Sequence, residues 1–234
     1  MTTKILIADD HPLFRDAIKS ALHDQLNGGA ADTTMMEAGD FAEAMKVLEG
    51  EADLDLLLLD LTMPGASGLS ALVAVRAGFP AVPVVVVSAH DEPSTVRRVL
   101  GLGASGFISK SANMETIRGS VRSVLAGEVA MPDGIDLGSE HDPEVEDLIN
   151  RIRTLTPQQA RVLGMLSEGL LNKQIAYELS VSEATIKAHV SAVLQKLNVD
   201  SRTQAVIRMS KIGNDLLQAP VDDGGADASD GLNS

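Results

Sequence analysis

The chain has 234 residues and a net charge of −14, and 44% of its residues are hydrophobic, a composition typical of a folded globular protein. Cysteine is absent, which excludes a disulfide framework, a thiolate metal site and a cysteine nucleophile. The N-terminus lacks the apolar core of a signal peptide and no apolar run is long enough to span a bilayer, so we expect a cytoplasmic protein that does not associate with a membrane.

Residues 1–127 alternate between short apolar runs and amphipathic stretches. The longer runs are continuously apolar, which is typical of parallel strands buried on both faces. They predict five strands, at 5–8, 34–38, 54–59, 82–87 and 106–108. The amphipathic stretches predict helices at 13–26, 40–49, 68–78, 93–102 and 112–126. Five strand–helix repeats indicate an α/β fold with a doubly wound, five-stranded parallel sheet.

A linker and a tail flank the second predicted domain. Residues 128–153 are interpreted as linker, because 131–142 are turn-rich and acidic; a short helix then begins at Pro143, a residue favoured at the first helical position. Residues 214–234 carry five acidic and no basic residues and show no hydrophobic pattern. We therefore expect this tail to be disordered.

Residues 154–213 predict a small all-α domain. Capping boxes begin at Thr156 and Ser201, and Asn172 and Ser182 are predicted to cap two further helices. With seven basic and four acidic residues, this is the one basic block in an acidic chain. Nucleic acid is a polyanion, so we expect any DNA contact to be made here.

Polar side chains follow four of the predicted strands. Asp9 and Asp10 end the first, Asp60 the third, Ser88 the fourth, and Lys110 follows the fifth. Ligands of open parallel sheets bind at the carboxyl ends of the strands, where these groups would meet. Each residue alone could merely end a strand, but together they indicate a site. Three carboxylates favour Mg²⁺, and the set suits phosphoryl transfer to Asp60 as nucleophile.

Four segments resemble the receiver domain of two-component response regulators, which has a flavodoxin-like fold. They are Leu6-Ile7-Ala8-Asp9-Asp10-His11, Asp60-Leu61-Thr62-Met63-Pro64-Gly65, Val87-Ser88-Ala89 and Gly103-Ala104-Ser105-Gly106-Phe107-Ile108-Ser109-Lys110. The resemblance covers about residues 1–127. Ser111 departs from it, because the family usually has proline after the active-site lysine.

This resemblance implies a role for each residue of the site. Asp60 would be the phosphoacceptor, and Ser88 and Lys110 would hold the phosphoryl oxygens. The resemblance further implies that Asp10, Asp60 and the Thr62 carbonyl bind Mg²⁺ with Asp9 helping through water, that Phe107 is the switch aromatic, and that Thr62 and His90 tune dephosphorylation. Because residues 92–126 lead into the linker, we expect their surface to pass the signal on.

Residues 172–197 predict a helix-turn-helix. One face of the second helix is apolar, whereas the opposite face is small and polar, which would let it approach base edges in a major groove. A single lysine there would be an ordinary solvated residue, but the whole pattern favours DNA binding. The predicted DNA-binding residues are Lys173, Ala184, Thr185, Lys187, Ala188, His189, Ser191, Lys196 and Arg202.

Residues 154–213 resemble the LuxR-type helix-turn-helix. The resemblance is carried by Leu155-Thr156-Pro157, Gly169-Leu170-Leu171-Asn172-Lys173-Gln174-Ile175-Ala176, Thr185-Ile186-Lys187-Ala188-His189-Val190 and Lys196-Leu197-Asn198-Val199-Asp200-Ser201-Arg202-Thr203. It implies dimerisation through the last helix, by Val206, Ile207 and Met209. The two resemblances together imply a NarL/FixJ-type response regulator. Its partners would be a cognate sensor histidine kinase, double-stranded DNA, a second copy of the phosphorylated chain and RNA polymerase.

Two alternatives belong to other classes of protein. An Asp-nucleophile phosphatase resembling the haloacid dehalogenase superfamily would need a second Asp where this chain has Thr62. A LuxR-type quorum receptor would need an aromatic-rich ligand pocket, and aromatic residues make up only 2% of this chain. We therefore expect a DNA-binding regulator and not an enzyme.

Overall fold

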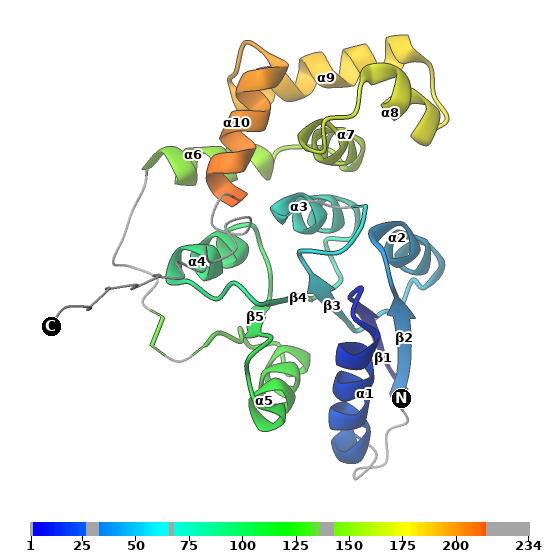
Figure 1. The fold of residues 1–234 in the computed structure, drawn as a ribbon, viewed down its shortest axis with the longest axis vertical. Helices are drawn as coiled ribbons and strands as arrows, with labels where there is room; N and C mark the ends of the chain where they lie inside the picture. The colour runs from blue at the N-terminus through cyan, green and yellow to red at the C-terminus, as the bar shows by residue number, and fades with distance from the viewer. Residues whose placement is uncertain (1, 27–32, 66–67, 133, 136–142, 214–234) are drawn as a thin grey trace, which may run out of the picture.

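The structure of the chain is a computed structural model that describes residues 2–26, 33–65, 68–132, 134–135 and 143–213. An α/β layer sandwich forms one part of the molecule, and a group of helices stacks on top of it (Figure 1). The predicted acidic tail at 214–234 and most of the predicted linker loop at 131–142 lie outside the described residues.

The first part is built on a five-stranded parallel sheet with the order β2-β1-β3-β4-β5. The strands are β1 (Thr3–Ala8), β2 (Thr33–Ala38), β3 (Leu56–Asp60), β4 (Val84–Ser88) and β5 (Gly106–Ser109). Every residue of β3 and β4 is buried, as the continuously apolar runs predict. The predicted doubly wound fold is therefore confirmed.

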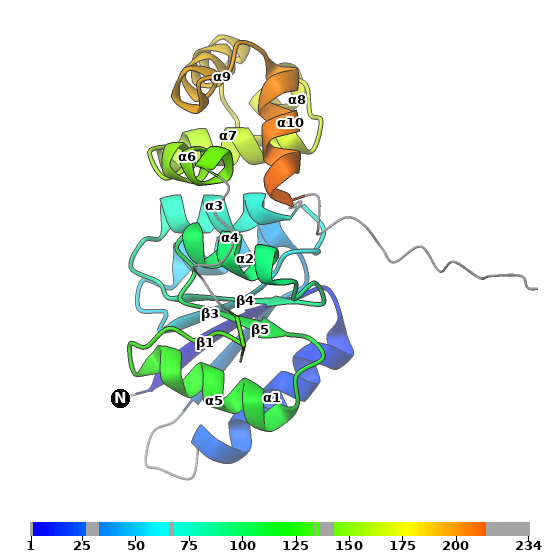
Figure 2. The ribbon, with the colours of Figure 1, turned by 90° about the vertical axis from the view of Figure 1, so that its left-hand side faces the viewer.

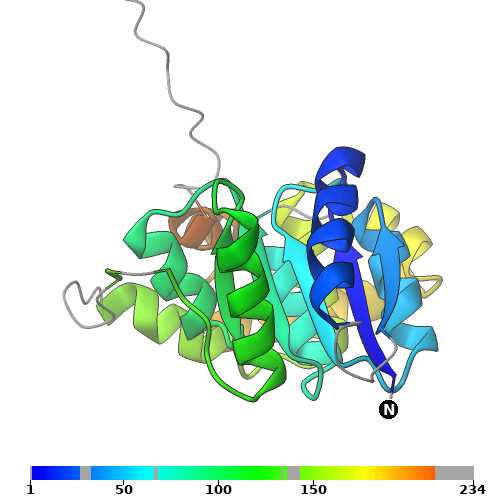
Figure 3. The ribbon, with the colours of Figure 1, turned by 90° about the horizontal axis from the view of Figure 1, so that it is seen from below.

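Five helices cover the two faces of the sheet. They are α1 (Pro12–Leu26), α2 (Phe41–Gly50), α3 (Leu69–Gly78), α4 (Pro93–Gly101) and α5 (Met114–Leu125). Helices α1 and α5 lie side by side on one face, and α2, α3 and α4 lie on the other (Figures 2 and 3). The sheet thus separates two apolar layers, one of which continues into the second part of the molecule.

Two strands begin two residues later than the sequence predicts. Strand β4 begins at Val84, because the N–H of Val82 donates to the Phe79 carbonyl in a turn and Pro83 has no N–H to offer a neighbouring strand. Strand β3 begins at Leu56, although Leu54 is also buried. An apolar run marks what is buried, whereas a strand requires a hydrogen-bonded partner as well.

The second part is all helical, as predicted. Its helices are α6 (Pro143–Ile152), α7 (Pro157–Ser167), α8 (Asn172–Glu178), α9 (Glu183–Leu197) and α10 (Arg202–Gly213). Thr156 and Ser182 cap α7 and α9 as expected, each accepting a backbone N–H on its side-chain oxygen. Helix α9 ends at Asn198, which adopts a left-handed conformation with φ of 53°.

The predicted cap at Asn172 is wrong. Asn172 is the first helical residue of α8, and Leu171 precedes it as the cap residue. The Leu171 N–H donates to Oε1 of Gln174 at 2.7 Å, so a glutamine one turn into the helix satisfies this end. The box at Ser201 is half formed: Ser201 Oγ accepts the N–H of Gln204, but Oε1 of Gln204 binds the N–H of Asp200.

The two parts pack against each other chiefly through α3 and α7. All residues from Leu69 to Val75 of α3 are buried, because the sheet covers one side and α7 the other. Gly164 of α7 faces Ser70 of α3, and a methyl group at Gly164 would lie 3.7 Å from Cβ of Ser70, an ordinary contact distance. The expected surface at 92–126 makes a smaller contribution, through α4 and α6, where Ile149 lies against Gly101.

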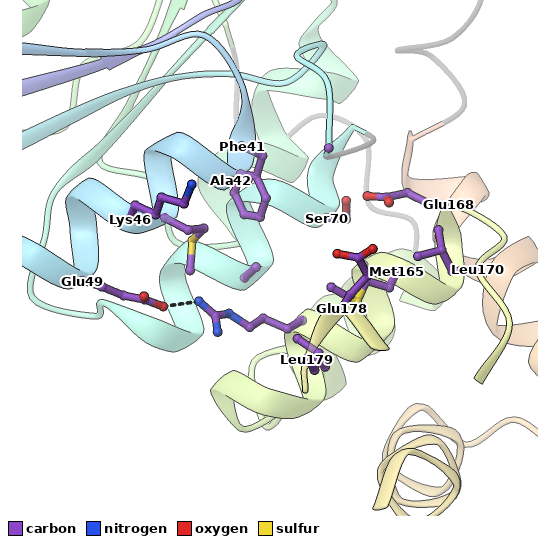
Figure 4. A pocket seen from close by; sticks show the side chains of 15 residues that line it. Phe41, Ala42, Lys46, Glu49, Ser70, Met165, Glu168, Leu170, Glu178 and Leu179 are labelled. Atoms are coloured by element: carbon purple, nitrogen blue, oxygen red, sulfur yellow. Dashed lines mark hydrogen bonds and ion pairs between the residues drawn. The ribbon is translucent and has the colours of Figure 1, made fainter. Parts of the chain in front are cut away.

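Beside this contact lies a cavity of about 510 Å³ lined by residues of α2, α3, α7 and α8. Glu49 of α2 pairs across it with Arg161 of α7 (Figure 4). Helix α9 lies on the side of the helical part that faces away from the sheet (Figures 1 and 2). The sheet-containing part therefore leaves the outer face of α9 uncovered.

Candidate functional site

The strand order brings the predicted polar residues to one edge of the sheet. Asp9 and Asp60 stand at the ends of the adjacent strands β1 and β3, Ser88 ends β4, and Lys110 follows β5. Lys110 reaches across two strands, and its Nζ lies 2.8 Å from Oδ2 of Asp60 and 2.8 Å from Oδ2 of Asp9. The structure thus assembles the site that the sequence predicts at the carboxyl ends of the strands.

The electrostatics of this edge centre on Lys110. Asp9 and Asp60 are 2% and 1% exposed, so their charges are poorly solvated. Burial alone would lower the pKa of Lys110, but its hydrogen bonds to Asp60 and Asp9 and their charges outweigh burial, so its pKa is raised. Lys110 therefore stays protonated and supplies a fixed positive charge beside Asp60.

The same edge offers a set of ligands for a metal ion. Asp9, Asp10, His11 and Asp60 each present one ligand atom within 4.8 Å of the others. Oδ2 of Asp9 and Oδ1 of Asp10 are buried, and their close neighbours are Nζ of Lys110 at 2.8 Å and Nδ1 of His11 at 2.7 Å. Buried carboxylate oxygens grouped this closely repel one another and fit a hard divalent cation such as Mg²⁺.

Sequence reasoning did not include His11 in this cluster. Its backbone N–H donates to Oδ1 of Asp9 at 2.7 Å, and its Nδ1 lies 2.7 Å from Oδ1 of Asp10. The sequence feature that could have indicated it is the position of His11 directly after Asp9 and Asp10. His11 side-chain exposure is 63%, so the ring lies at the mouth of the site and not in its floor.

Thr62 and Ser88 are both close to Asp60. Thr62 lies in the loop that follows β3, and Ser88 ends the neighbouring strand β4. The hydroxyl of Thr62 donates to Asp60, 2.9 Å from Oδ1 and 3.0 Å from Oδ2, and its N–H lies 3.0 Å from Oδ1. Ser88 is fully buried, and its Oγ accepts the N–H of His90 at 3.1 Å. Nδ1 of His90 is buried and has no hydrogen-bond partner among the residues described.

Phe107 already lies inside the protein. It is 1% exposed and belongs to the apolar layer under α2, α3 and α4, three residues before Lys110 in β5 and the loop after it. The resemblance implies that this ring turns inward when Ser88 moves. In this structure the Phe107 ring already occupies the inward position. Any movement of this ring would therefore begin from its buried state.

Helix α9 presents most of the predicted DNA-binding residues to solvent. Its exposed side chains include Ala184, Thr185, Lys187, Ala188 and Ser191, and His189 is half-buried. Ile186, Val193 and Leu197 of the same helix are buried against α7 and α8. Lys173 is exposed near the start of α8. A helix face of small and polar side chains that carries Lys187 has the shape required to enter a major groove, and Lys173 lies on the neighbouring helix α8.

Two of the predicted phosphate contacts bind within the protein. Nζ of Lys196 donates to the Thr154 carbonyl at 2.6 Å and to Oε1 of Gln159 at 2.8 Å. Arg202 donates to the carbonyl of Leu170. In this arrangement both side chains tie helices together, which sequence spacing alone did not indicate.

Some of the predicted dimerisation residues of α10 are accessible, and one is buried. Ile207 is 51% exposed and Val206 is half-buried, so both are accessible to another chain. Met209 is a correction: it is 7% exposed and packs in the core between α10 and its neighbours α6 and α7. Met209 is buried because it lies on the face of α10 that packs against α6 and α7.

Two protein-family models match this chain. Residues 5–122 match the response regulator receiver domain, and residues 153–209 match the luxR family of bacterial regulatory proteins. The chain belongs to the NarL family of two-component, DNA-binding response regulators. Both the α/β part and the helical part are therefore accounted for by one family.

Relatives of this response regulator match over nearly their whole length. The glycerol metabolism activator of Pseudomonas putida is 41% identical over 218 residues, which cover 89% of this chain and 96% of that protein. The nitrate/nitrite response regulator NarP of Escherichia coli is 34% identical and is matched over 93% of its length, with 87% of this chain covered. The two family models confirm the order predicted from the sequence, in which the α/β part comes before the helical part.

A solved structure shows the same fold. RcsB of Salmonella enterica serovar Typhimurium, bound to a promoter with a phosphomimetic, is 22% identical with a TM-score of 0.51, over 91% of this chain and all of that one. Family membership settles the choice among the three classes considered: the chain is a transcription regulator and not a phosphatase enzyme. No helix in the described ranges has the length and apolarity needed to cross a bilayer.

Removing one carboxylate tests the metal site of this response regulator. We expect Asp10→Ala to lower Mg²⁺-dependent phosphorylation by at least about tenfold, because a ligand oxygen is lost. Asp16→Ala is the control, since Asp16 lies on α1 and pairs with Lys19 at 2.7 Å. Phosphorylation rates at a series of Mg²⁺ concentrations measure both; equal effects of the two substitutions would contradict the proposed cluster.

Proposed function

We propose that Asp60 accepts a phosphoryl group from a cognate sensor histidine kinase. The observation that carries this proposal is the buried carboxylate of Asp60 beside the ammonium of Lys110, at 2.8 Å. In the transfer, a carboxylate oxygen of Asp60 forms the new bond to phosphorus while the bond from phosphorus to the kinase histidine nitrogen breaks. The phosphoryl group adds about 1.5 to 2 negative charges to an acidic site, which Lys110 partly neutralises.

Each neighbouring residue has a proposed part in that step. Bound Mg²⁺, held by Asp9, Asp10, Asp60 and the Thr62 carbonyl, would offset the negative charge of the carboxylates and the phosphoryl oxygens. Ser88 would donate its hydroxyl proton to a phosphoryl oxygen, which is compatible with the bond that its Oγ accepts from the His90 N–H. Thr62 and His90 would set how readily water reaches the acyl phosphate, and Phe107 would report the movement of Ser88 to the protein core.

We further propose that phosphorylation promotes dimerisation and DNA binding. The exposed face of α9 would enter the major groove, with Lys173, Lys187 and His189 near phosphates and Ala184, Thr185, Ala188 and Ser191 near base edges. Val206 and Ile207 of α10 would meet their copies in a homodimer. Lys196 and Arg202 would reach DNA only by leaving their present carbonyl partners.

The proposed division of the chain is receiver 1–127, linker 128–153, DNA-binding domain 154–213 and acidic tail 214–234. A regulator of this kind works in the cytoplasm, where its kinase and the chromosome are both accessible, and it would act on transcription through RNA polymerase.

Replacing one lysine tests the DNA interface. We expect Lys187→Ala to weaken DNA binding by about two- to fivefold and to reduce the salt slope by about one, because a phosphate contact releases counterions. Lys46→Ala, which removes a lysine from α2 far from α9, serves as control. The measurement is affinity of the phosphorylated protein at several salt concentrations. Unchanged affinity and slope in Lys187→Ala would refute the proposed orientation of α9.

A further inference from the structure

An aromatic ring lies against the cation of the phosphorylation site. Nζ of Lys110 is 5.2 Å from the centroid of the Phe14 ring. Phe14 belongs to the first turn of α1, where its N–H donates to the His11 carbonyl, so the same short segment carries the ring and the carboxylates of Asp9 and Asp10. The ammonium is therefore held by two carboxylates and one aromatic face, of which Asp9 and Phe14 come from the segment after β1 and Asp60 from β3.

Lys110 needs such a restraint. Its side chain crosses from β5 to β3 and β1, and its four-carbon stem would otherwise sample many rotamers. Ammonium groups are attracted to the face of an aromatic ring at this separation, and the attraction grows when the pair is shielded from water. The side chain of Lys110 is 16% exposed and Phe14 is half-buried, so the pair lies mostly out of solvent.

We propose that Phe14 is a positioning residue for phosphoryl transfer, whose ring keeps the Lys110 ammonium placed between Asp9 and Asp60. The inference rests on the proposed roles of Asp60 and Lys110. Phe14 packs on the apolar layer formed with α1 and α5. An aliphatic side chain of similar size, such as leucine, would fill the same space. The ring therefore has two contacts, the apolar layer and the ammonium of Lys110, and an aliphatic side chain keeps only the first.

The test compares ring deletion with ring retention in the full-length protein. Phe14→Leu should slow phosphorylation by acetyl phosphate at saturating Mg²⁺ by about fivefold, the size expected for one cation–π contact. Phe14→Tyr should restore the rate to within about twofold of wild type. Phe79→Leu is the matched control, because Phe79 is also half-buried but packs on the other apolar layer, and it should leave the rate unchanged.

A spectroscopic measurement separates positioning from stability. The ring current of Phe14 should shift the Cε protons of Lys110 upfield in wild type and Phe14→Tyr, and the shift should vanish in Phe14→Leu. Thermal unfolding of each variant confirms that it is folded. If Phe14→Leu is not folded, Phe14→Met takes its place in the comparison.

The outcomes distinguish this inference from the proposed function. Suppose that the wild-type protein is labelled on Asp60. The positioning role is then refuted if Phe14→Leu is phosphorylated as fast as Phe79→Leu. It is also refuted if Phe14→Tyr is phosphorylated as slowly as Phe14→Leu. If wild type is not labelled, the phosphoacceptor proposal fails. The ring-current shift then still decides whether Phe14 holds Lys110.

Discussion

Asp60→Asn is expected to abolish phosphorylation by acetyl phosphate. Asparagine keeps the size of the side chain and can still accept hydrogen bonds from Thr62, but its amide is not a competent nucleophile toward phosphorus. Asp60 ends β3 and is 1% exposed, with Lys110 and Asp9 beside it. The measurement is covalent labelling of the intact protein by mass spectrometry, in the presence of Mg²⁺.

Asp53→Asn is the control for this prediction. Asp53 precedes the same strand but is exposed and pairs with Lys4 at 2.8 Å, so its loss should leave labelling unchanged. Asp60→Asn also removes one of the two carboxylates that face Lys110, but Asp9 still lies 2.8 Å from its Nζ and the repulsion among the carboxylates is reduced, so the variant is expected to stay folded. A folded Asn variant labelled at the wild-type level would show that another residue accepts the phosphoryl group.

Gly164→Leu is expected to separate the DNA-binding domain from the receiver. A methyl group at this position of α7 would already lie 3.7 Å from Ser70 on α3, so the further atoms of leucine must push the helices apart or turn into the neighbouring cavity, which Gly164 also lines. Forcing extra carbons into a packed contact costs about 1–3 kcal/mol. The expected result is a larger radius of gyration in solution scattering and faster amide exchange along α3.

Two variants control for effects within the helix itself. Gly164→Ala fits at ordinary contact distance and should leave both measurements unchanged. Gly119→Leu introduces the same side chain on α5, where nothing lies within 4 Å, and should also be neutral. If Gly164→Leu behaves like both controls, the α3–α7 contact does not hold the domains together in solution.

Much of the fold follows from local sequence patterns. The runs Leu56–Leu59 and Val84–Val87 are apolar without interruption, which requires burial on both faces and hence a parallel sheet covered by helices. Thr156 and Ser182 mark helix starts, because their side chains supply the acceptors that the first turn lacks. The positions of Asp60 and Lys110 after buried runs place them at one edge of the sheet.

The tertiary structure decided which groups share a surface. Periodicity shows that α3 is apolar, but only the docking of α7 explains why Leu69–Val75 are buried on every side. The same patterns left Met209 as a candidate for a dimer surface and Lys196 and Arg202 as candidates for phosphate contacts, and they gave no role to Phe14. The physical reason is that hydrophobic and capping signals act over a few residues, whereas the partners of these side chains are more than 30 residues away in sequence or on another helix.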